Sequence, residues 1–167
     1  MSVRDGLLAV LSLGPAYGLQ LHAELTARAP HRAALNVGQV YSTLDRATQS
    51  GLVCSAGTTP DGLPLFRLTE SGADRARQWM TLPSDGPASW TEMLDQVLVT
   101  ATVAPNLVTD LSRDYRRAWS ESEKQGPDPA ALATRLFSGA ATKWLAAVDQ
   151  SLAARDPIPL SPIRPRR

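Results

Sequence analysis

Residues 36–53 read Asn-Val-Gly-Gln-Val-Tyr-Ser-Thr-Leu-Asp-Arg-Ala-Thr-Gln-Ser-Gly-Leu-Val, and they carry the clearest structural signal in the chain. Apolar residues recur there every three or four positions, which predicts a helix over residues 37–50 with one buried face. Asn36 is a suitable N-cap, and Gly51 is a suitable glycine for the C-terminal end. The buried face comprises Val37, Val40, Leu44 and Ala47. The opposite, mostly polar face carries Gly38, Gln39, Ser42, Thr43, Asp45 and Arg46.

The neighbouring segments supply two helices before this one and a hairpin after it. The first helix ends at Leu13-Gly14-Pro15, and the second covers about residues 16–29 and is closed by Pro30. Gly18 costs the second helix about 1 kcal/mol of propensity, which predicts close packing against a neighbouring helix. After Gly51 we expect strands at 52–55 and 65–68, a turn-rich tip at 57–62, and a fourth helix that Thr69 caps and that continues to Met80. This order of elements is that of a winged helix-turn-helix.

The second half of the chain is predicted to be helical. A Pro- and Gly-containing linker at residues 81–89 precedes apolar stripes that end near Pro105 and at Gly126-Pro127. Asp128 and Pro129 then begin a long helix in the preferred order of cap and first-turn proline. The expected fold is therefore mainly α with a small β-hairpin wing. We expect a winged helix-turn-helix DNA-binding domain at 1–80, a helical dimerisation domain at 90–155 and a disordered basic tail at 156–167.

The polar face of the third helix suits the major groove of double-stranded DNA. Gln39 can bond adenine through two hydrogen bonds, and Arg46 can bond guanine or phosphate. Ser42 and Thr43 can reach base edges or phosphate, and the helix N-terminus at Asn36 and Gly38 can offer N–H groups to a phosphate. A polar outer face alone indicates only exposure to solvent, but the order of the elements favours the DNA interpretation.

Three segments resemble the PadR-type transcriptional regulators. They are Leu8-Ala9-Val10-Leu11-Ser12 with Gly14-Pro15, Val37 to Arg46 followed by Ser50-Gly51-Leu52-Val53, and Phe66-Arg67-Leu68-Thr69-Glu70-Ser71-Gly72. The resemblance implies a homodimer that joins through its C-terminal helices, binds a two-fold-related operator and usually represses. It also implies that Tyr41 contacts a DNA phosphate. The alternative for Tyr41 is a tyrosine buried between the second and third helices.

The wing departs from the pattern of that family. The positions before its aromatic residue are Leu63, Pro64 and Leu65 instead of a basic cluster, so Arg67 is the remaining basic contact nearby. Each lost phosphate contact lowers the slope of log affinity against log salt concentration by about one unit. We therefore expect weaker non-specific affinity than in a relative with a basic wing. The Arg-rich tail could supply charge, although we interpret it as a solubilising disordered end.

The long C-terminal helix has more apolar surface than a single face can bury. Its expected length of roughly 38 Å is close to one turn of DNA, and dimerisation would use the surplus surface. The expected interface consists of Leu136, Phe137, Ala140, Trp144, Leu145 and Val148. Trp90 and Met93 could contribute to a pocket for a small apolar or aromatic effector. Ordinary core and interface packing is the alternative for both.

Composition and motifs argue against other classes of function. The net charge of +1, the 43% hydrophobic content and the lack of a long apolar run indicate a soluble cytoplasmic chain without a membrane span. A signal peptide is not expected because the apolar patch near Gly6 has no small-residue cleavage site. The single cysteine, Cys54, is interpreted as a small buried residue, and His22 as partly exposed or hydrogen-bonded.

No catalytic motif is present, so we expect no enzyme, no cofactor and no bound metal. A winged helix that binds another protein and not DNA remains the alternative function. The nearly neutral wing favours that alternative, whereas the third helix, with Gln39 and Arg46 on its outer face, disfavours it.

Overall fold

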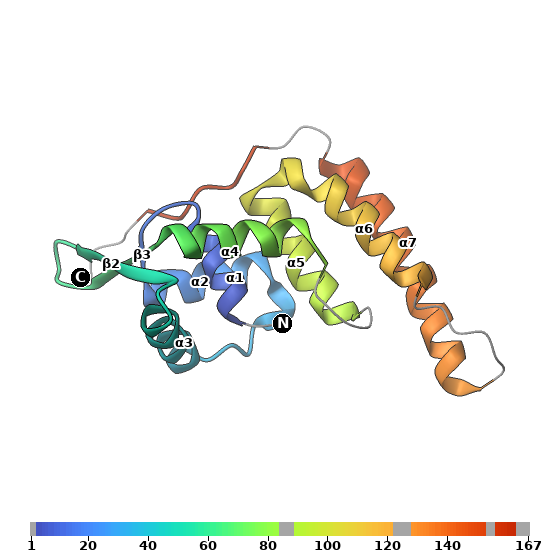
Figure 1. The fold of residues 1–167 in the computed structure, drawn as a ribbon, viewed down its shortest axis with the longest axis horizontal. Helices are drawn as coiled ribbons and strands as arrows, with labels where there is room; N and C mark the ends of the chain where they lie inside the picture. Colours follow the sequence, from blue (N-terminus) through green and yellow to red (C-terminus); the bar gives the residue numbers. More distant parts are fainter. Residues whose placement is uncertain (1–2, 84–88, 122–127, 153–155, 163–167) are drawn as a thin grey trace. The chain divides into compact units, whose positions relative to one another are not determined.

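The structure is a computed structural model that describes residues 3–83, 89–121, 128–152 and 156–162 (Figure 1). These residues form two compact units that divide between Trp79 and Met80. The C-terminal segment from Ile158 belongs to the first unit, and the second unit ends at Pro157. The predicted mainly helical fold with a winged helix-turn-helix is confirmed.

The first unit contains five helical segments and a small sheet within its described residues. In chain order these elements are α1 (Val3–Leu11), β1 (Ala16–Tyr17), α2 (Gly18–Arg28), the 3₁₀ helix η1 (Pro30–Arg32), α3 (Val37–Gln49), β2 (Val53–Thr58), β3 (Pro64–Leu68) and α4 (Glu70–Thr81). The core lies between α1, α2, α3 and β2. It is built from fully buried Leu7, Leu8, Val10, Leu21, Leu25, Val40, Leu44 and Val53.

The sheet has a strand that the sequence analysis assigned to a helix. Ala16 and Tyr17 were expected to begin the second helix, but they form β1, and the helix begins at Gly18. β1 pairs antiparallel with β3 through Ala16 opposite Phe66 and Tyr17 opposite Leu65. The strand order is β1-β3-β2, so the hairpin of β2 and β3 is extended at one edge by a segment from far upstream. Pairing with β3 satisfies the backbone groups of these two residues in place of a helical turn.

Gly18 and Tyr41 set the spacing between α2 and α3. A Cβ built on Gly18 would lie 2.6 Å from Cε1 and Cζ of Tyr41, so the helices approach as closely as a glycine permits. Close packing was the compensation predicted for the low helix propensity of this glycine. At the start of α3, the Asn36 side chain accepts a hydrogen bond from the Gly38 N–H at 2.7 Å, which confirms the predicted cap.

The wing is fastened to α4 at its base. Gly51 follows α3 with φ +72°, a conformation that favours glycine. The Thr69 N–H donates to Leu52 O at 3.1 Å, and the Thr69 hydroxyl donates to Gly51 O at 2.6 Å while accepting from the Gly72 N–H at 3.1 Å. The predicted role of Thr69 as a helix cap is confirmed, and the cap also joins both ends of the hairpin.

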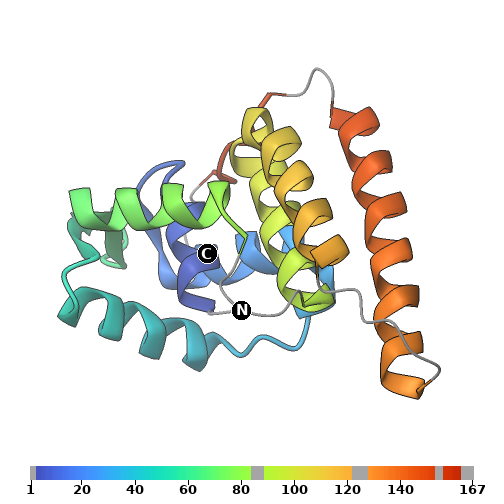
Figure 2. The same cartoon turned by 45° about the vertical axis from the view of Figure 1, so that its right-hand side comes forward.

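The second unit is helical in the residues that the structure describes. It contains α5 (Trp90–Val103), the 3₁₀ helix η2 (Pro105–Leu107), α6 (Val108–Glu121) and α7 (Pro129–Leu152). Asp128 caps α7 by accepting from the Ala130 and Ala131 N–H groups, each at 3.0 Å. α7 runs alongside α6 in both views (Figures 1 and 2). The core of this unit is a cluster of Met93, Val97, Val108, Leu111, Tyr115, Trp119, Ala141 and Leu145.

Two predicted surface residues of this unit belong to that core. Leu145 was expected in the dimer interface, and Met93 was expected beside an effector, but both are fully buried. The sulfur of Met93 accepts a hydrogen bond from the indole N–H of Trp119 at 3.2 Å. The sequence spacing placed both residues on apolar helix faces without distinguishing the face that packs within the unit from the face that remains outside.

The expectation of a disordered tail is wrong for residues 158–161. Their backbone forms hydrogen bonds with three side chains of α2, and these bonds place the segment in the first unit. The expected end of a helix at Gly126-Pro127 and most of the expected linker, residues 84–88, lie outside the described residues. The final residues, 163–167, lie outside them as well.

Candidate DNA-binding surface

α3 presents most of its predicted contact face to solvent. Gly38, Gln39, Ser42 and Arg46 are exposed along one side of the helix, and Asn36 is exposed at its N-terminus. The Arg46 guanidinium is held against the helix because its Nε donates to Ser42 O at 3.1 Å and its Nη2 donates to the Thr43 hydroxyl oxygen at 3.4 Å. This helix therefore carries a positioned cation beside an exposed glutamine.

Thr43 lies beneath this exposed face. Its side chain is only 6% exposed, and its hydroxyl donates to Gln39 O at 2.7 Å. Burial leaves the hydroxyl little access to a DNA base or phosphate, in contrast to its expected role as a contact. Thr43 instead supports Arg46 from below.

Tyr41 combines features of both interpretations given for it. It is half-buried, and its ring packs against Gly18 at the beginning of α2. The structure thus places it between α2 and α3, as the packing alternative expected, while part of the side chain reaches solvent.

Three arginines from separate elements surround a hollow beside α3. Its volume is about 530 Å³, and it is lined by Val3, Arg4, Arg32, Gln39, Thr43, Arg46 and Ser50. Arg4 comes from α1 and Arg32 from η1, so the fold brings them to the same side of α3 as Gln39 and Arg46. Neither Arg4 nor Arg32 was predicted from the sequence to lie at this surface. The only signal for Arg32 was its place in the loop that precedes the third helix.

The turn between α2 and α3 is held by a histidine. His22 Nε2 donates to the carbonyl oxygen of Leu35 at 2.7 Å, because a carbonyl can only accept. His22 is half-buried, which confirms the expectation of a hydrogen-bonded or partly exposed residue. The bond fixes the segment immediately before Asn36 and so helps to set the direction of α3.

The tip of the wing is held by hydrogen bonds, and the wing carries little positive charge. Arg67 is exposed on β3, opposite Cys54 of β2. Cys54 was expected to be buried, but it is half-buried and its thiol is free. At the tip, the Thr59 hydroxyl donates to Asp61 at 2.6 Å and accepts from the Leu63 N–H at 2.9 Å. The wing therefore presents one cation on its strand and one carboxylate at its end.

A comparison with protein families finds a match over residues 7–78 to the model described as "Transcriptional regulator PadR-like family". Residues 7–78 are thus similar to PadR-like transcriptional regulators, which confirms the predicted resemblance for this part of the chain. The matched residues include α2, α3 and the wing, which are the elements that form the surface described above.

The comparison with solved structures finds several similar chains, among them a PadR protein from Bacillus subtilis. Bacillus subtilis PadR in complex with operator DNA is 16% identical in sequence, with 92% of this chain and 98% of that chain covered and a TM-score of 0.47. No curated protein matches the chain significantly.

The second unit leaves apolar side chains of α7 exposed. Leu136 is 66% exposed and Phe137 is 49% exposed, and Ala140 is also exposed. Trp144 and Val148 are half-buried and pack against the core of the unit. Trp90 lies between Phe137 and Trp144, with ring centroids 6.3 and 6.1 Å apart. Of the predicted interface residues, the first three are thus available to a partner.

Among the described residues, no group of three or more His, Cys, Asp and Glu side chains could hold a metal ion. Within the part of the chain that the structure describes, no helix combines the length and apolar character needed to cross a membrane.

Proposed function

We propose that the chain binds double-stranded DNA sequence-specifically by inserting α3 into the major groove. The observation that carries this proposal is the exposed row of Gln39, Ser42 and Arg46, flanked by Arg4 and Arg32 around the hollow. Gln39 reads adenine through its amide, and Arg46 reads guanine or contacts phosphate. Arg4 and Arg32 neutralise phosphates and set the position of the helix.

Contacts to the backbone complete the proposed surface. The N-terminal end of α3, at Gly38, binds a phosphate, because the helix dipole favours negative charge there. The exposed part of Tyr41 and the guanidinium of Arg67 also contact phosphates. Asn36 acts mainly through its cap, because its side-chain oxygen already accepts from Gly38.

The proposed active form is a homodimer on a palindromic operator. The exposed apolar side chains of Leu136, Phe137 and Ala140 supply a surface that a second copy would cover. α7 has 24 residues, which corresponds to about 36 Å and is close to the spacing of half-sites one DNA turn apart. By resemblance to the family, we propose that the bound dimer represses transcription.

A small apolar or aromatic effector is proposed to act at the half-buried Trp90. Its indole lies beside Phe137 and Trp144, so a flat ligand could stack there and change the packing of α7. Quenching of tryptophan fluorescence by such a ligand, lost in Trp90→Phe, supports this site. Equal quenching in Trp90→Phe excludes it.

Selection of DNA fragments from a genomic pool, followed by titration at several salt concentrations, tests the DNA-binding proposal. We expect the logarithm of the affinity to fall with the logarithm of the salt concentration with a slope of several units. Gln39→Ala is expected to lose about 1–3 kcal/mol of base preference. Gln49→Ala is a matched control because Gln49 is exposed at the far end of α3, and the N-terminal residues of a recognition helix contact the bases.

The same titration distinguishes the alternative function. A protein-interaction module would show neither a steep salt slope nor any base preference. The nearly neutral wing is the observation that favours this alternative, since Asp61 lies at its tip and Arg67 is a single exposed cation on β3. Absence of both salt slope and base preference in the unmodified chain would overturn the proposed DNA binding.

A further inference from the structure

The first unit buries three charged side chains among its described residues. Asp5 of α1 is 4% exposed, and Glu24 and Arg28 of α2 are each 6% exposed. A buried charge is costly unless an opposite charge or several hydrogen bonds compensate for it. The partners of each group therefore indicate its role in the fold.

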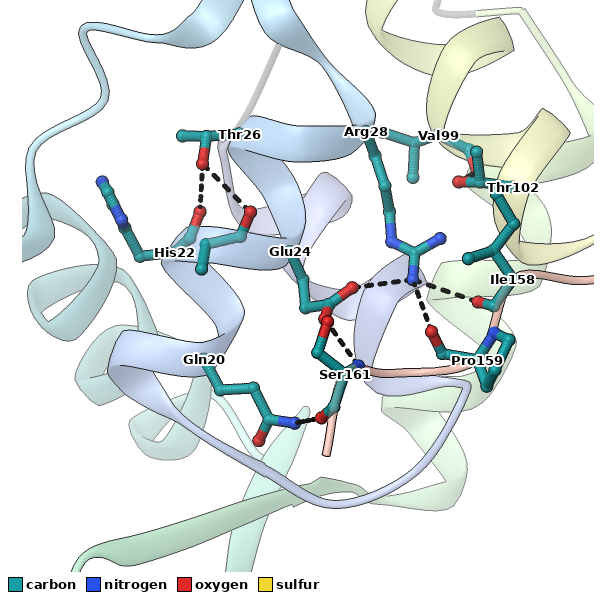
Figure 3. Close-up of polar contacts among 11 residues, drawn as sticks. Gln20, His22, Glu24, Thr26, Arg28, Val99, Thr102, Ile158, Pro159 and Ser161 are labelled. Carbon is teal, nitrogen blue, oxygen red and sulfur yellow. Dashed lines mark hydrogen bonds and ion pairs between the residues drawn. The ribbon is translucent and has the colours of Figure 1, made fainter. Parts of the chain in front are cut away.

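Glu24 and Arg28 are compensated by each other and by the backbone of residues 158–161 (Figure 3). Arg28 Nη2 donates to Glu24 Oε2 at 2.8 Å and to Ile158 O at 3.0 Å, and the Ser161 N–H donates to Glu24 Oε1 at 2.7 Å. Burial raises the pKa of Glu24, but hydrogen bonds from Ser161 and Arg28 outweigh this effect and leave the pKa below its ordinary value of 4.5. Neither residue lines the hollow beside α3.

Asp5 differs because two arginines share its carboxylate. Arg75 of α4 donates from Nε to Oδ1 at 3.0 Å and from Nη2 to Oδ2 at 3.4 Å, so it engages both oxygens. Arg4 donates from Nε and Nη2 to Oδ1 alone, at 3.3 Å each. A guanidinium that engages both carboxylate oxygens forms the stronger pair. Arg75 is therefore the main partner of Asp5, and Arg4 is the secondary partner.

Arg4 connects this ionic group to the proposed DNA-binding surface. It lines the hollow beside α3 together with Arg32 and Arg46, and none of the described lining residues is acidic. Asp5 and Arg75 do not line the hollow. The Arg4 side chain is 40% exposed, whereas that of Asp5 is 6% exposed. Of the two cations that share Asp5, Arg4 is thus the one at the hollow.

The balance of charge explains why the second cation matters. Two arginines and one aspartate give the group a net charge of +1. While Arg75 pairs with Asp5, Arg4 can turn to a DNA phosphate without leaving a buried carboxylate unpaired. In the absence of Arg75, the same movement would leave an uncompensated buried charge, which is strongly unfavourable. Arg4 would then stay with Asp5.

We propose that Arg75 is a positioning residue of the DNA-binding surface. By holding Asp5, it leaves Arg4 available to contact a DNA phosphate at the hollow beside α3. This inference rests on the proposed DNA-binding function, and it extends control of that surface to α4, the helix that follows the wing. Neither Asp5 nor Arg75 contacts DNA in this arrangement.

Titration of DNA at several salt concentrations tests the role of Arg75. Arg4→Gln is expected to lower the slope of log affinity against log salt concentration by about 0.9 unit, the value for one phosphate contact. Arg75→Gln is expected to lower the slope by a similar amount, although Arg75 makes no contact itself. The affinity advantage of the unmodified chain then shrinks roughly 3.5-fold between about 50 and 200 mM salt. An unchanged slope in either variant overturns the proposal.

Arg77→Gln is the matched control for the loss of charge. Arg77 lies on the same helix and pairs with Asp74 at 3.0 Å, and both of these side chains are 69% exposed. Because an exposed pair of this kind holds no buried carboxylate, Arg77→Gln is expected to change the slope little. If it lowers the slope as much as Arg75→Gln does, the charge of α4 and not the shared carboxylate is the cause, and the proposal fails.

A conservative variant tests whether pairing with Asp5 is the cause. Arg75→Lys keeps a cation that can pair with the carboxylate, although without the fork of a guanidinium. It is expected to retain most of the slope. A loss as large as in Arg75→Gln would contradict the proposal.

A double-mutant cycle shows whether Arg75 acts through Arg4. In a chain that already carries Arg4→Gln, Arg75→Gln is expected to lower the slope no further than Arg77→Gln does. A further loss of about 0.9 unit would mean that Arg75 itself contacts a phosphate, which overturns its positioning role. The slope compares affinities of one preparation, so a smaller folded fraction does not change it.

The outcomes separate this inference from the function on which it rests. If Arg75→Gln keeps the full slope while Gln39→Ala loses base preference, the positioning role fails and the DNA-binding function stands. If the unmodified chain shows neither slope nor preference, the DNA-binding function itself fails.

Discussion

At the scale of single residues, Gly72 has the least freedom among the described glycines. A Cβ built there would lie 1.9 Å from the backbone oxygen of Leu52 and 2.9 Å from its carbonyl carbon. That oxygen accepts from the Thr69 N–H, so it cannot move without loosening the junction between the wing and α4. The glycine is thus required by a close approach between two backbones.

Gly72→Ala is expected to lower the free energy of unfolding by about 1–3 kcal/mol, the usual cost of overpacking. Gly139→Ala is the control, since Gly139 lies in α7 and has no atom within 4 Å of the added Cβ. This control is expected to stabilise the chain by about 0.5–1 kcal/mol through helix propensity. Denaturant unfolding measures both changes, and a stabilising Gly72→Ala would contradict the described junction.

At the scale of elements, the sequence predicted those whose signals are local. α3 was predictable because its caps, Asn36 and Gly51, and its apolar spacing all lie within one short stretch. β1 was not, because two residues acquire strand character only by pairing with β3 about fifty positions later. Residues 158–161 left no signal either, since α2 binds their main-chain atoms, which every residue possesses.

The residues of the candidate site likewise fall into those that local spacing predicted and those that only tertiary packing brings together. The exposed face of α3 followed from helical spacing, so Gln39 and Arg46 could be named from the sequence. Arg4 and Arg32 approach α3 only through tertiary packing of α1 and η1. Thr43 was predicted on the exposed face but is buried. A residue at the border between the two faces of an amphipathic helix can lie on either side.

The hydrogen bond between Ser161 and Glu24 is expected to weaken in acid. The folded pKa of Glu24 lies below its ordinary value of 4.5, so the ionised carboxylate stabilises the fold above that pH and loses its contribution as the pH falls through the folded pKa. The difference in unfolding free energy between the unmodified chain and Glu24→Gln should stay constant from about pH 7 to 5 and shrink below about 4.5. A difference that grows on acidification would contradict this assignment.

At the scale of the whole molecule, the exposed side chains of α7 raise the question of assembly. Leu136 is 66% exposed, and its neighbour Phe137 is 49% exposed. Two-fold assembly through identical patches is the commonest arrangement of soluble oligomers, and it matches the symmetry of a palindromic operator. Assembly would therefore cover α7 and place two copies of α3 on the DNA together.

Leu136→Glu is expected to convert the proposed dimer into a monomer, because it would bury two carboxylates in an apolar interface. Light scattering after gel filtration measures the mass, which should fall by half. Leu82→Glu is a matched control, since Leu82 is 53% exposed and lies outside α7, and it is expected to leave the mass unchanged. A dimer that survives Leu136→Glu would place the interface elsewhere.

The hydrogen bonds between α2 and residues 158–161 have a consequence for biosynthesis. The first unit is discontinuous along the chain: its first piece ends at Trp79, whereas its last piece begins at Ile158. A ribosome adds roughly 5–20 residues per second. Glu24 and Arg28 therefore stay hydrated for several seconds after residue 79 is made, until residues 158–161 have been synthesised. A product that ends before Ile158 would still carry α3, but it would lack the hydrogen bonds that Gln20, Glu24 and Arg28 form with residues 158–161.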